Sequence, residues 1–199
     1  MRPGTGWIDL LRHGEGEGGA RYRGSTDDPL TAAGWQQMEA AVDGQGPWDR
    51  IVTSPLARCA DFARALARRQ VVVLTVDERW REIDFGAWEG RTAEALMGED
   101  PQALQRFWRD PVAHPPPGGE SVHAFRDRVL TAWLELVSRC RGERVLIVTH
   151  GGPIRVVLTH LAGRSLADVL AIPVPLGHRV RWQPEVSGEL SGLPRRGSF

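Results

Sequence analysis

An apolar stretch near the N-terminus ends abruptly in charged and reactive residues, and this junction constrains the fold more than any other feature. The run Trp7-Ile8-Asp9-Leu10-Leu11 is followed directly by Arg12, His13 and Gly14. Such a run is typical of a buried strand, and ligands of open α/β sheets bind just beyond the carboxyl ends of strands. The sequence therefore predicts that Arg12 and His13 stand at the ligand-binding edge of a sheet.

Strands and helices alternate along the rest of the chain. Further strands are expected at 48–53, 71–76 and 144–149, and the continuous β-branched run of 71–76 is typical of a parallel strand buried on both faces. Amphipathic patterns predict helices between them, after Thr31, over 56–69, after Ser121 and after Pro153. This alternation predicts an α/β fold, a three-layer αβα sandwich with a mostly parallel central sheet.

The remaining segments predict smaller features of one domain that spans residues 1–199. One or two short helices, broken near Asp100-Pro101, are expected within a lid insertion of about 91–117. Residues 166–190 predict a short helical turn and one or two closing strands, around 179–182 and 186–190. The tail, 191–199, is expected to be loosely ordered.

Composition limits the partners and the chemistry. The 25 basic and 25 acidic residues balance, which argues against nucleic-acid binding, and no apolar run approaches the roughly 20 residues of a membrane span. Without a signal-peptide pattern at its start, the chain is expected to be cytoplasmic. Lysine is absent, so a nucleotide P-loop is excluded, and any anion must be held by arginines, histidines and backbone N–H groups.

Three predicted strands end in residues that could hold such an anion. Arg12 and His13 follow the first, Ser54-Pro55 with Arg58 the second, and His150-Gly151 the strand at 144–149. Carboxyl ends of parallel strands share one edge, so these side chains converge and form a compact site for a tetrahedral dianion such as phosphate. The acidic residues do not follow metal-ligand spacing, so neither a metal nor another cofactor is expected.

Histidine is the expected nucleophile. The predicted pocket offers no cysteine, since Cys59 and Cys140 are expected to be small buried residues of helices, and Ser54 lacks an uncommitted base. A leaving alkoxide needs a proton, which the acidic and aromatic loop at 77–90 could supply. Its candidate donors are Glu78, Glu82, Asp84 and Glu89.

Six motifs between residues 8 and 155, taken together, resemble the histidine phosphatase superfamily, the phosphoglycerate mutase-like group, and occur in the order of that family. They are Leu11-Arg12-His13-Gly14-Glu15, Asp28-Pro29-Leu30-Thr31 with Gly34, Ser54-Pro55-Leu56 with Arg58, Glu82-Ile83-Asp84-Phe85-Gly86 with Trp88-Glu89-Gly90, Pro117-Gly118-Gly119-Glu120-Ser121, and Val148-Thr149-His150-Gly151-Gly152 with Arg155.

The resemblance implies a role for each matching residue. His13 would attack phosphorus and form a phosphohistidine, and Glu82, rather than Glu78 or Asp84, would act as general acid and then base. Arg12, Arg58 and His150 would hold the phosphoryl oxygens, assisted by the N–H of Gly151.

The first loop departs from the mutases of the family. Gly16-Glu17-Gly18-Gly19 stands where bisphosphoglycerate-dependent mutases carry an asparagine phosphate ligand, so hydrolysis is favoured over mutase activity. The segment 18–25 and the chain length resemble α-ribazole phosphatases, which act in assembly of the cobalamin nucleotide loop. The expected substrate is therefore α-ribazole 5′-phosphate, with Arg21, Arg23 and Gly24 as possible substrate-binding residues.

Several alternatives stay open. Arg21 and Arg23 are as well explained as solvated loop residues, and tryptophans near the mouth would either stack on a flat base or pack the lid; they are Trp80, Trp88 and Trp108. The function could instead be that of a broad-specificity small-molecule phosphatase, a phosphoglycerate mutase or a non-catalytic phospho-ligand-binding module. The expected ligand is a small phosphomonoester, and neither nucleic acid nor a membrane is expected as a partner. The chain is expected to be a monomer or a homodimer.

Overall fold

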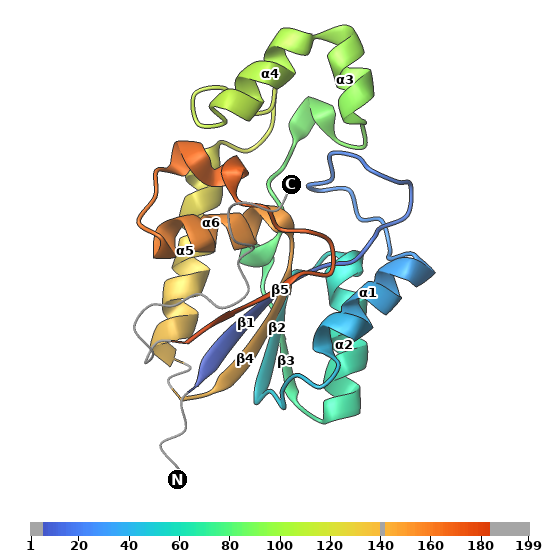
Figure 1. Ribbon diagram of the computed structural model, residues 1–199, viewed down its shortest axis with the longest axis vertical. Coiled ribbons are helices and arrows are strands. Elements are labelled where there is room, and N and C mark those ends of the chain that lie inside the picture. Colours follow the sequence, from blue (N-terminus) through green and yellow to red (C-terminus); the bar gives the residue numbers. More distant parts are fainter. Residues whose placement is uncertain (1–5, 140–141, 184–199) are drawn as a thin grey trace.

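The computed structural model describes residues 6–139 and 142–183. The predicted strand at 186–190, the tail 191–199 and Cys140 lie outside them. A five-stranded sheet in the order β3-β2-β4-β1-β5 forms the centre of the molecule (Figure 1), with four parallel strands and β5 antiparallel to β1. The strands are β1 (Trp7–Arg12), β2 (Arg50–Thr53), β3 (Val73–Val76), β4 (Arg144–Thr149) and β5 (Arg179–Trp182).

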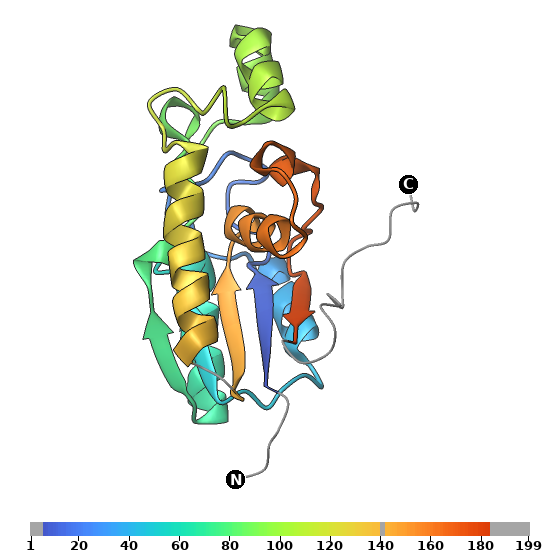
Figure 2. The ribbon, with the colours of Figure 1, turned by 90° about the vertical axis from the view of Figure 1, so that its left-hand side faces the viewer.

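Helices cover both faces of the sheet, which confirms the three-layer α/β sandwich. Figure 2 shows α5 and α6 in front of the sheet, whereas α1 and α2 lie behind it. Successive residues of β1 serve the two layers, since Leu10 belongs to the core beneath α5 and α6 and Leu11 to the core beneath α1 and α2. The four helices are α1 (Ala32–Val42), α2 (Ala57–Gln70), α5 (Val122–Arg139) and α6 (Gly151–Leu161).

The prediction that residues 71–76 form a strand buried on both faces is wrong in two respects. The strand begins only at Val73, because Val71 takes the left-handed conformation (φ 56°) that ends α2. β3 is also an edge strand, and its Val73 and Val76 side chains are 60% and 46% exposed. A β-branched run fits any strand of an α/β sheet, and its position within the sheet depends on contacts distant in sequence.

A buried carboxylate joins the first and last described strands. Asp9 in β1 is fully buried and accepts hydrogen bonds from Arg179 Nη1 (2.6 Å) and Arg181 Nε (2.9 Å) of β5 and from Trp48 Nε1 (2.8 Å). A buried carboxylate is tolerated only with such partners. Asp9 interrupts the apolar run of β1 because it pairs the strand with β5.

The predicted pair of short helices lies beyond the carboxyl ends of the parallel strands (Figure 1). α3 (Ala93–Glu99) stops at Asp100, whose side chain accepts a hydrogen bond from Ala103 N (2.9 Å) and so caps α4 (Pro101–Arg109). Three short 3₁₀ turns complete the described structure, namely η1 (Glu78–Trp80), η2 (Gly86–Trp88) and η3 (Leu166–Ala171). None of the helices in the described structure is long and apolar enough to cross a membrane.

Candidate active site

The carboxyl ends of β1, β2 and β4 bring the predicted site residues together. A cavity of about 420 Å³ opens there, which we name the His13 cavity; its lining includes Arg12, His13, Glu82, Arg21 and Arg155. His150, at the end of β4, lies directly behind His13, with the two ring centres 5.1 Å apart. The convergence predicted from three strand ends is therefore present.

His13 is held in one tautomer. Its Nδ1 lies 2.7 Å from the carbonyl oxygen of Gly14, and because a carbonyl only accepts, Nδ1 carries the proton and donates. Burial, reinforced by Arg58 and Arg12, lowers the pKa of His13 to about 3. The ring is therefore neutral at physiological pH, and its Nε2 keeps a free electron pair.

Arg12 carries an unused donor beside His13. One terminal amino group donates to the carbonyl of Val174, but the buried Nε has no hydrogen-bond partner within the described part of the chain. A Cβ atom on Gly151 would lie 3.3 Å from this Nε, so the first residue of α6 adjoins it. A buried donor without an acceptor is costly, and this one belongs to a residue that lines the His13 cavity.

The Glu82 carboxyl group is fixed at the start of α6. Its Oε2 accepts a hydrogen bond from Gly152 N (3.0 Å) and its Oε1 from Ile83 N (3.0 Å). With Glu82 in this position a side chain at residue 152 is excluded, because a Cβ there would lie 1.9 Å from Glu82 Oε1. The second glycine of the His-Gly-Gly motif therefore lets this carboxyl group reach the helix N-terminus.

His150 does not line the His13 cavity and is fully buried behind it. Its Nδ1 accepts from Arg58 Nε (3.3 Å), so in the neutral ring Nε2 carries the proton and donates to Ser54 Oγ (2.7 Å). Burial, then the charge of Arg58, lowers the pKa of His150 well below its ordinary value. Both nitrogens are thus committed to protein partners, and its phosphate contact stays a prediction.

Cys59 also lies at this site, which sequence reasoning did not place there. Its sulfur is 3.6 Å from His150 Nε2, and its thiol donates to the carbonyl of Thr149 (3.3 Å). The side chain is fully buried, as predicted, and burial raises the pKa of its thiol, so Cys59 stays protonated. Cys59 therefore packs beneath His150 and does not compete as a nucleophile.

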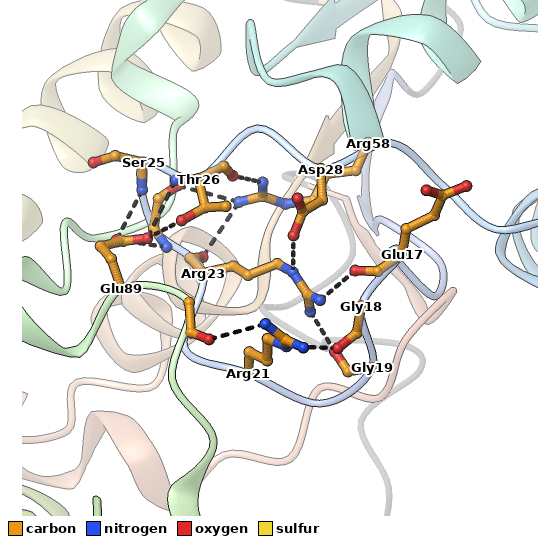
Figure 3. A network of polar contacts seen from close by, with 12 residues as sticks. Glu17, Gly18, Gly19, Arg21, Arg23, Ser25, Thr26, Asp28, Arg58 and Glu89 are labelled. Atoms are coloured by element: carbon orange, nitrogen blue, oxygen red, sulfur yellow. Dashed lines mark hydrogen bonds and ion pairs between the residues drawn. The ribbon is translucent and has the colours of Figure 1, made fainter. Parts of the chain in front are cut away.

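Arg58 binds the loop of residues 16–29 (Figure 3), part of which lines the His13 cavity. Besides His150, its guanidinium donates to the carbonyls of Thr26 (2.6 Å) and Gly24 (3.2 Å). The loop also caps α2, because Asp27 Oδ1 accepts from Ala57 N (2.6 Å). Arg58 is fully buried and connects the loop to His150 through these hydrogen bonds. Its contact with phosphate stays a prediction.

Glu89 holds the same loop from the other side (Figure 3). Its carboxylate accepts from the N–H groups of Gly24 (2.8 Å), Ser25 (2.9 Å) and Thr26 (3.2 Å), from the Thr26 hydroxyl (2.6 Å) and from Phe85 N (3.0 Å). A Cβ on Gly24 would lie 1.9 Å from the carbonyl oxygen of Ile83. Gly24 is therefore part of this contact between two loops, and its predicted role in substrate binding is not needed to explain it.

Arg21 and Arg23 line the His13 cavity, but they donate hydrogen bonds to carbonyl groups of their own loop. Arg23 binds Asp28 (2.6 Å) and the carbonyls of Gly19 (2.6 Å) and Glu17, and only 11% of its side chain is exposed. Arg21 is more exposed and donates to Gly18 O (2.6 Å). Arg23 is thus a half-buried residue whose hydrogen bonds stabilise its own loop, whereas Arg21 remains available to a ligand.

Arg155 belongs to the site, although the motif analysis gave it no role. It lines both the His13 cavity and a neighbouring cavity of about 310 Å³, which we name the Phe107 cavity. The Arg155 Nε donates to Ile172 O (2.8 Å), which fixes the guanidinium. Only its spacing from His150, one helical turn into α6, could have indicated that it reaches the site.

Of the three tryptophans, Trp88 packs against the lid residues Leu96, Leu104 and Phe107, whereas Trp80 belongs to the core beneath α5 and α6 and not to the lid. Trp80 and Trp88 are buried, whereas Trp108 is 46% exposed, lines the Phe107 cavity and donates to the Tyr22 hydroxyl (2.9 Å). Across residues 6–139 and 142–183, no three His, Cys, Asp or Glu side chains are grouped so as to hold a metal ion.

Residues 8–187 match the family model of the histidine phosphatase superfamily (branch 1), and the chain belongs to that family. The Bifunctional protein Rv2228c of Mycobacterium tuberculosis is 37% identical over 154 residues, which cover 75% of this chain but 42% of that relative, so the chain spans less than half its length. A 2,3-bisphosphoglycerate-dependent phosphoglycerate mutase of Rhizobium etli is 32% identical over 177 residues, 83% of this chain and 85% of the mutase.

Solved structures of similar proteins include phosphatases. The alpha-ribazole phosphatase from Shigella flexneri aligns with a TM-score of 0.77 at 26% identity and covers 88% of this chain and 89% of its own. A mycobacterial glucosyl-3-phosphoglycerate phosphatase aligns with a TM-score of 0.78 at 29% identity, covering 88% of each chain. The relatives thus include phosphatases and mutases, and the structural likeness extends to phosphatases of different substrates.

Proposed function

We propose that the chain is a metal-independent phosphomonoester hydrolase that works through a phosphohistidine at His13. The observation that carries the proposal is the meeting, in one cavity, of a neutral His13 with a free Nε2, an Arg12 donor that lacks an acceptor, and the fixed Glu82 carboxyl group. A nucleophile, an anion-binding group and a proton donor are the three parts that phosphoryl transfer requires.

In the first step, the electron pair of His13 Nε2 attacks phosphorus, and the phosphorus–oxygen bond to the alcohol breaks. The departing oxygen takes a proton from the carboxyl group of Glu82, so the alcohol leaves neutral and Glu82 becomes a carboxylate. The phosphorylated ring is cationic, and its Nδ1–H keeps its hydrogen bond to Gly14. Arg12 faces the charge on the phosphoryl oxygens.

In the second step, water attacks the phosphohistidine. The Glu82 carboxylate takes a proton from this water as the new phosphorus–oxygen bond forms, and the phosphorus–nitrogen bond breaks. His13 returns to its neutral form and inorganic phosphate leaves. Arg58 and His150 support the site from behind His13, through the hydrogen bonds that connect them to each other and to Ser54.

For the substrate, we propose α-ribazole 5′-phosphate, hydrolysed in the cytoplasm during assembly of the cobalamin nucleotide loop. The support is the resemblance of segment 18–25 to α-ribazole phosphatases and the structural likeness to the Shigella flexneri enzyme. A broad-specificity phosphatase is the alternative within the same chemistry.

A mutase is the second candidate, because a relative of similar length is a phosphoglycerate mutase. A mutase must return the phosphoryl group to a bound alcohol and exclude water from the phosphohistidine. Bisphosphoglycerate-dependent interconversion of 2- and 3-phosphoglycerate that exceeds phosphate release would establish this candidate in place of the hydrolase.

The test is phosphate release in the presence of a chelator, by wild type, His13→Ala and His123→Ala. His123 is an exposed histidine of α5 and serves as the matched control. The substrates are α-ribazole 5′-phosphate, p-nitrophenyl phosphate and 3-phosphoglycerate. We expect His13→Ala to lower kcat by at least about a thousandfold, and His123→Ala to match wild type.

A preference for α-ribazole 5′-phosphate would support the proposed substrate, and broad turnover would favour the alternative. Turnover that the chelator abolishes would refute metal independence. Turnover that survives His13→Ala would refute the nucleophile.

A further inference from the structure

The two cavities at the site meet at a shared boundary. Four residues line both of them, namely Tyr22, Glu82, Phe85 and Arg155. His13 and Arg12 line only the first cavity, whereas residues of α4 and η3 line only the second. The proposed proton donor therefore lies on the boundary, and the proposed nucleophile on one side of it.

This placement orients a substrate. If Glu82 gives its proton to the departing oxygen, that oxygen lies at the boundary, with phosphorus on the side of His13. The carbon skeleton of the alcohol then extends in the opposite direction, into the Phe107 cavity. This step rests on the proposed function, since it uses the roles assigned there to His13 and Glu82.

The lining of the Phe107 cavity defines what fits. Apart from Glu82 and Arg155 at the boundary, its walls carry no charged side chain, and they include Phe107, Phe125 and Leu170. Trp108 forms part of its exposed rim. Apolar walls of this kind favour an aromatic or aliphatic ring over a short charged alcohol.

Arg155 adds a polar requirement at the boundary. Its Nε donates to Ile172 O, whereas its two terminal amino groups donate to no acceptor among residues 6–139 and 142–183. Nη1 adjoins Gly151 at the start of α6. Arg155 lines both cavities, so a hydroxyl oxygen close to the ester carbon, at their boundary, could accept from these donors.

We infer that the enzyme's substrates are phosphomonoesters of alcohols that carry an apolar ring, bound in the Phe107 cavity, and an oxygen substituent beside the ester carbon, bound by Arg155. Small anionic alcohols such as glycerate or serine lack the ring. This makes the Phe107 cavity the specificity site and Arg155 a specificity-determining residue.

The first arm of the test compares kcat/KM for benzyl phosphate and propyl phosphate. Wild type is expected to prefer benzyl phosphate about thirtyfold, as burial of a ring implies. Leu170→Asp puts a carboxylate into the cavity and should remove most of this preference. Leu134→Asp, at an exposed position of α5, is the matched control and should keep it. Trp108→Ala, at the exposed rim, should lower the preference without a risk to folding.

The second arm compares 2-hydroxy-2-phenylethyl phosphate with 2-phenylethyl phosphate. Wild type is expected to favour the hydroxylated ester, and Arg155→Met to hydrolyse the two alike. If Arg155→Met instead lowers both rates equally, Arg155 acts through Glu82 and not on the alcohol, and its assigned role is wrong.

The outcomes separate the two proposals. Equal, His13-dependent rates with benzyl and propyl phosphate would overturn the specificity site and leave the hydrolase intact. Absence of His13-dependent hydrolysis for every ester would overturn both. A preference that Leu170→Asp and Leu134→Asp reduce equally would show that the Phe107 cavity does not hold the ring.

Discussion

Replacing Glu89 by alanine tests how far one carboxylate organises the loop over the site. The substitution removes an acceptor of five hydrogen bonds, four of them partly buried. At about 0.5–1 kcal/mol for each of the four, the free energy of unfolding should fall by about 2–4 kcal/mol. Because Arg58 holds the same loop from below, we also expect kcat/KM to fall by at least about tenfold, since misplacement at a site is costly.

Urea unfolding and kcat/KM for one aryl phosphate measure the two effects. Glu78→Ala is the matched control, because this carboxylate of the same segment is 71% exposed and pairs with Arg81 at the surface; its loss should cost under about 0.5 kcal/mol. A Glu89→Ala protein whose stability and kcat/KM both equal those of Glu78→Ala would refute the reasoning.

The same residue gives a pH dependence with a definite sign. Burial opposes ionisation of Glu89, yet hydrogen bonds from the Thr26 hydroxyl and from backbone N–H groups outweigh it and hold its pKa below the ordinary 4.5. A depressed carboxyl pKa contributes stability above the unfolded pKa, and this contribution disappears as the pH falls through the folded pKa. The stability difference between wild type and Glu89→Gln should therefore be full above about pH 5 and shrink below 4.5; a difference that grows on acidification would contradict the assignment.

Three further predictions concern the site and the sheet. Glu82→Gln should lower kcat/KM for an alkyl phosphate about 10²- to 10⁴-fold but much less for p-nitrophenyl phosphate, whose anion leaves without a proton; equal losses would argue against a proton donor. ¹⁵N NMR should show His13 neutral, with its proton on Nδ1, at every pH above 5, as a pKa of about 3 requires; titration near 6.5 would contradict this. Asp9→Ala leaves Arg179 and Arg181 without their buried partner and should lower stability by about 3–5 kcal/mol in urea unfolding, whereas a loss under 1 kcal/mol would show that water replaces the carboxylate.

The convergence of the site could be predicted because it depends on local patterns. Each of three strands is marked by an apolar run and ends in a reactive side chain, and parallel strands bring their carboxyl ends to one edge. The 5.1 Å separation of the two histidine rings agrees with the convergence expected for His13 and His150, whereas the roles of the site residues stay predictions.

Other features depend on contacts that no local pattern encodes. The donors to Glu89 come from an irregular loop more than 60 residues away, and the partners of Asp9 in β5 lie 170 and 172 residues downstream. The edge position of β3 and the hydrogen bonds of Arg23 within its own loop follow from the assembled structure in the same way. The periodicity of apolar residues predicts whether a segment is a helix or a strand. It does not predict which residue, distant in sequence, will pair with a buried charge.

The pairing of β1 has a consequence for how the chain folds. Both of its neighbours in the sheet, β4 and β5, lie at least 130 residues further along the chain, so β1 emerges from the ribosome long before either partner. Leu10 and Leu11, which are buried in the folded protein, stay exposed to solvent until those strands have been synthesised. Asp9 likewise lacks the cationic partner Arg179 until that residue has been synthesised. Contacts between residues so far apart in sequence slow folding. We therefore expect the sheet to form late in folding, when β1 pairs with β4 on one side and β5 on the other.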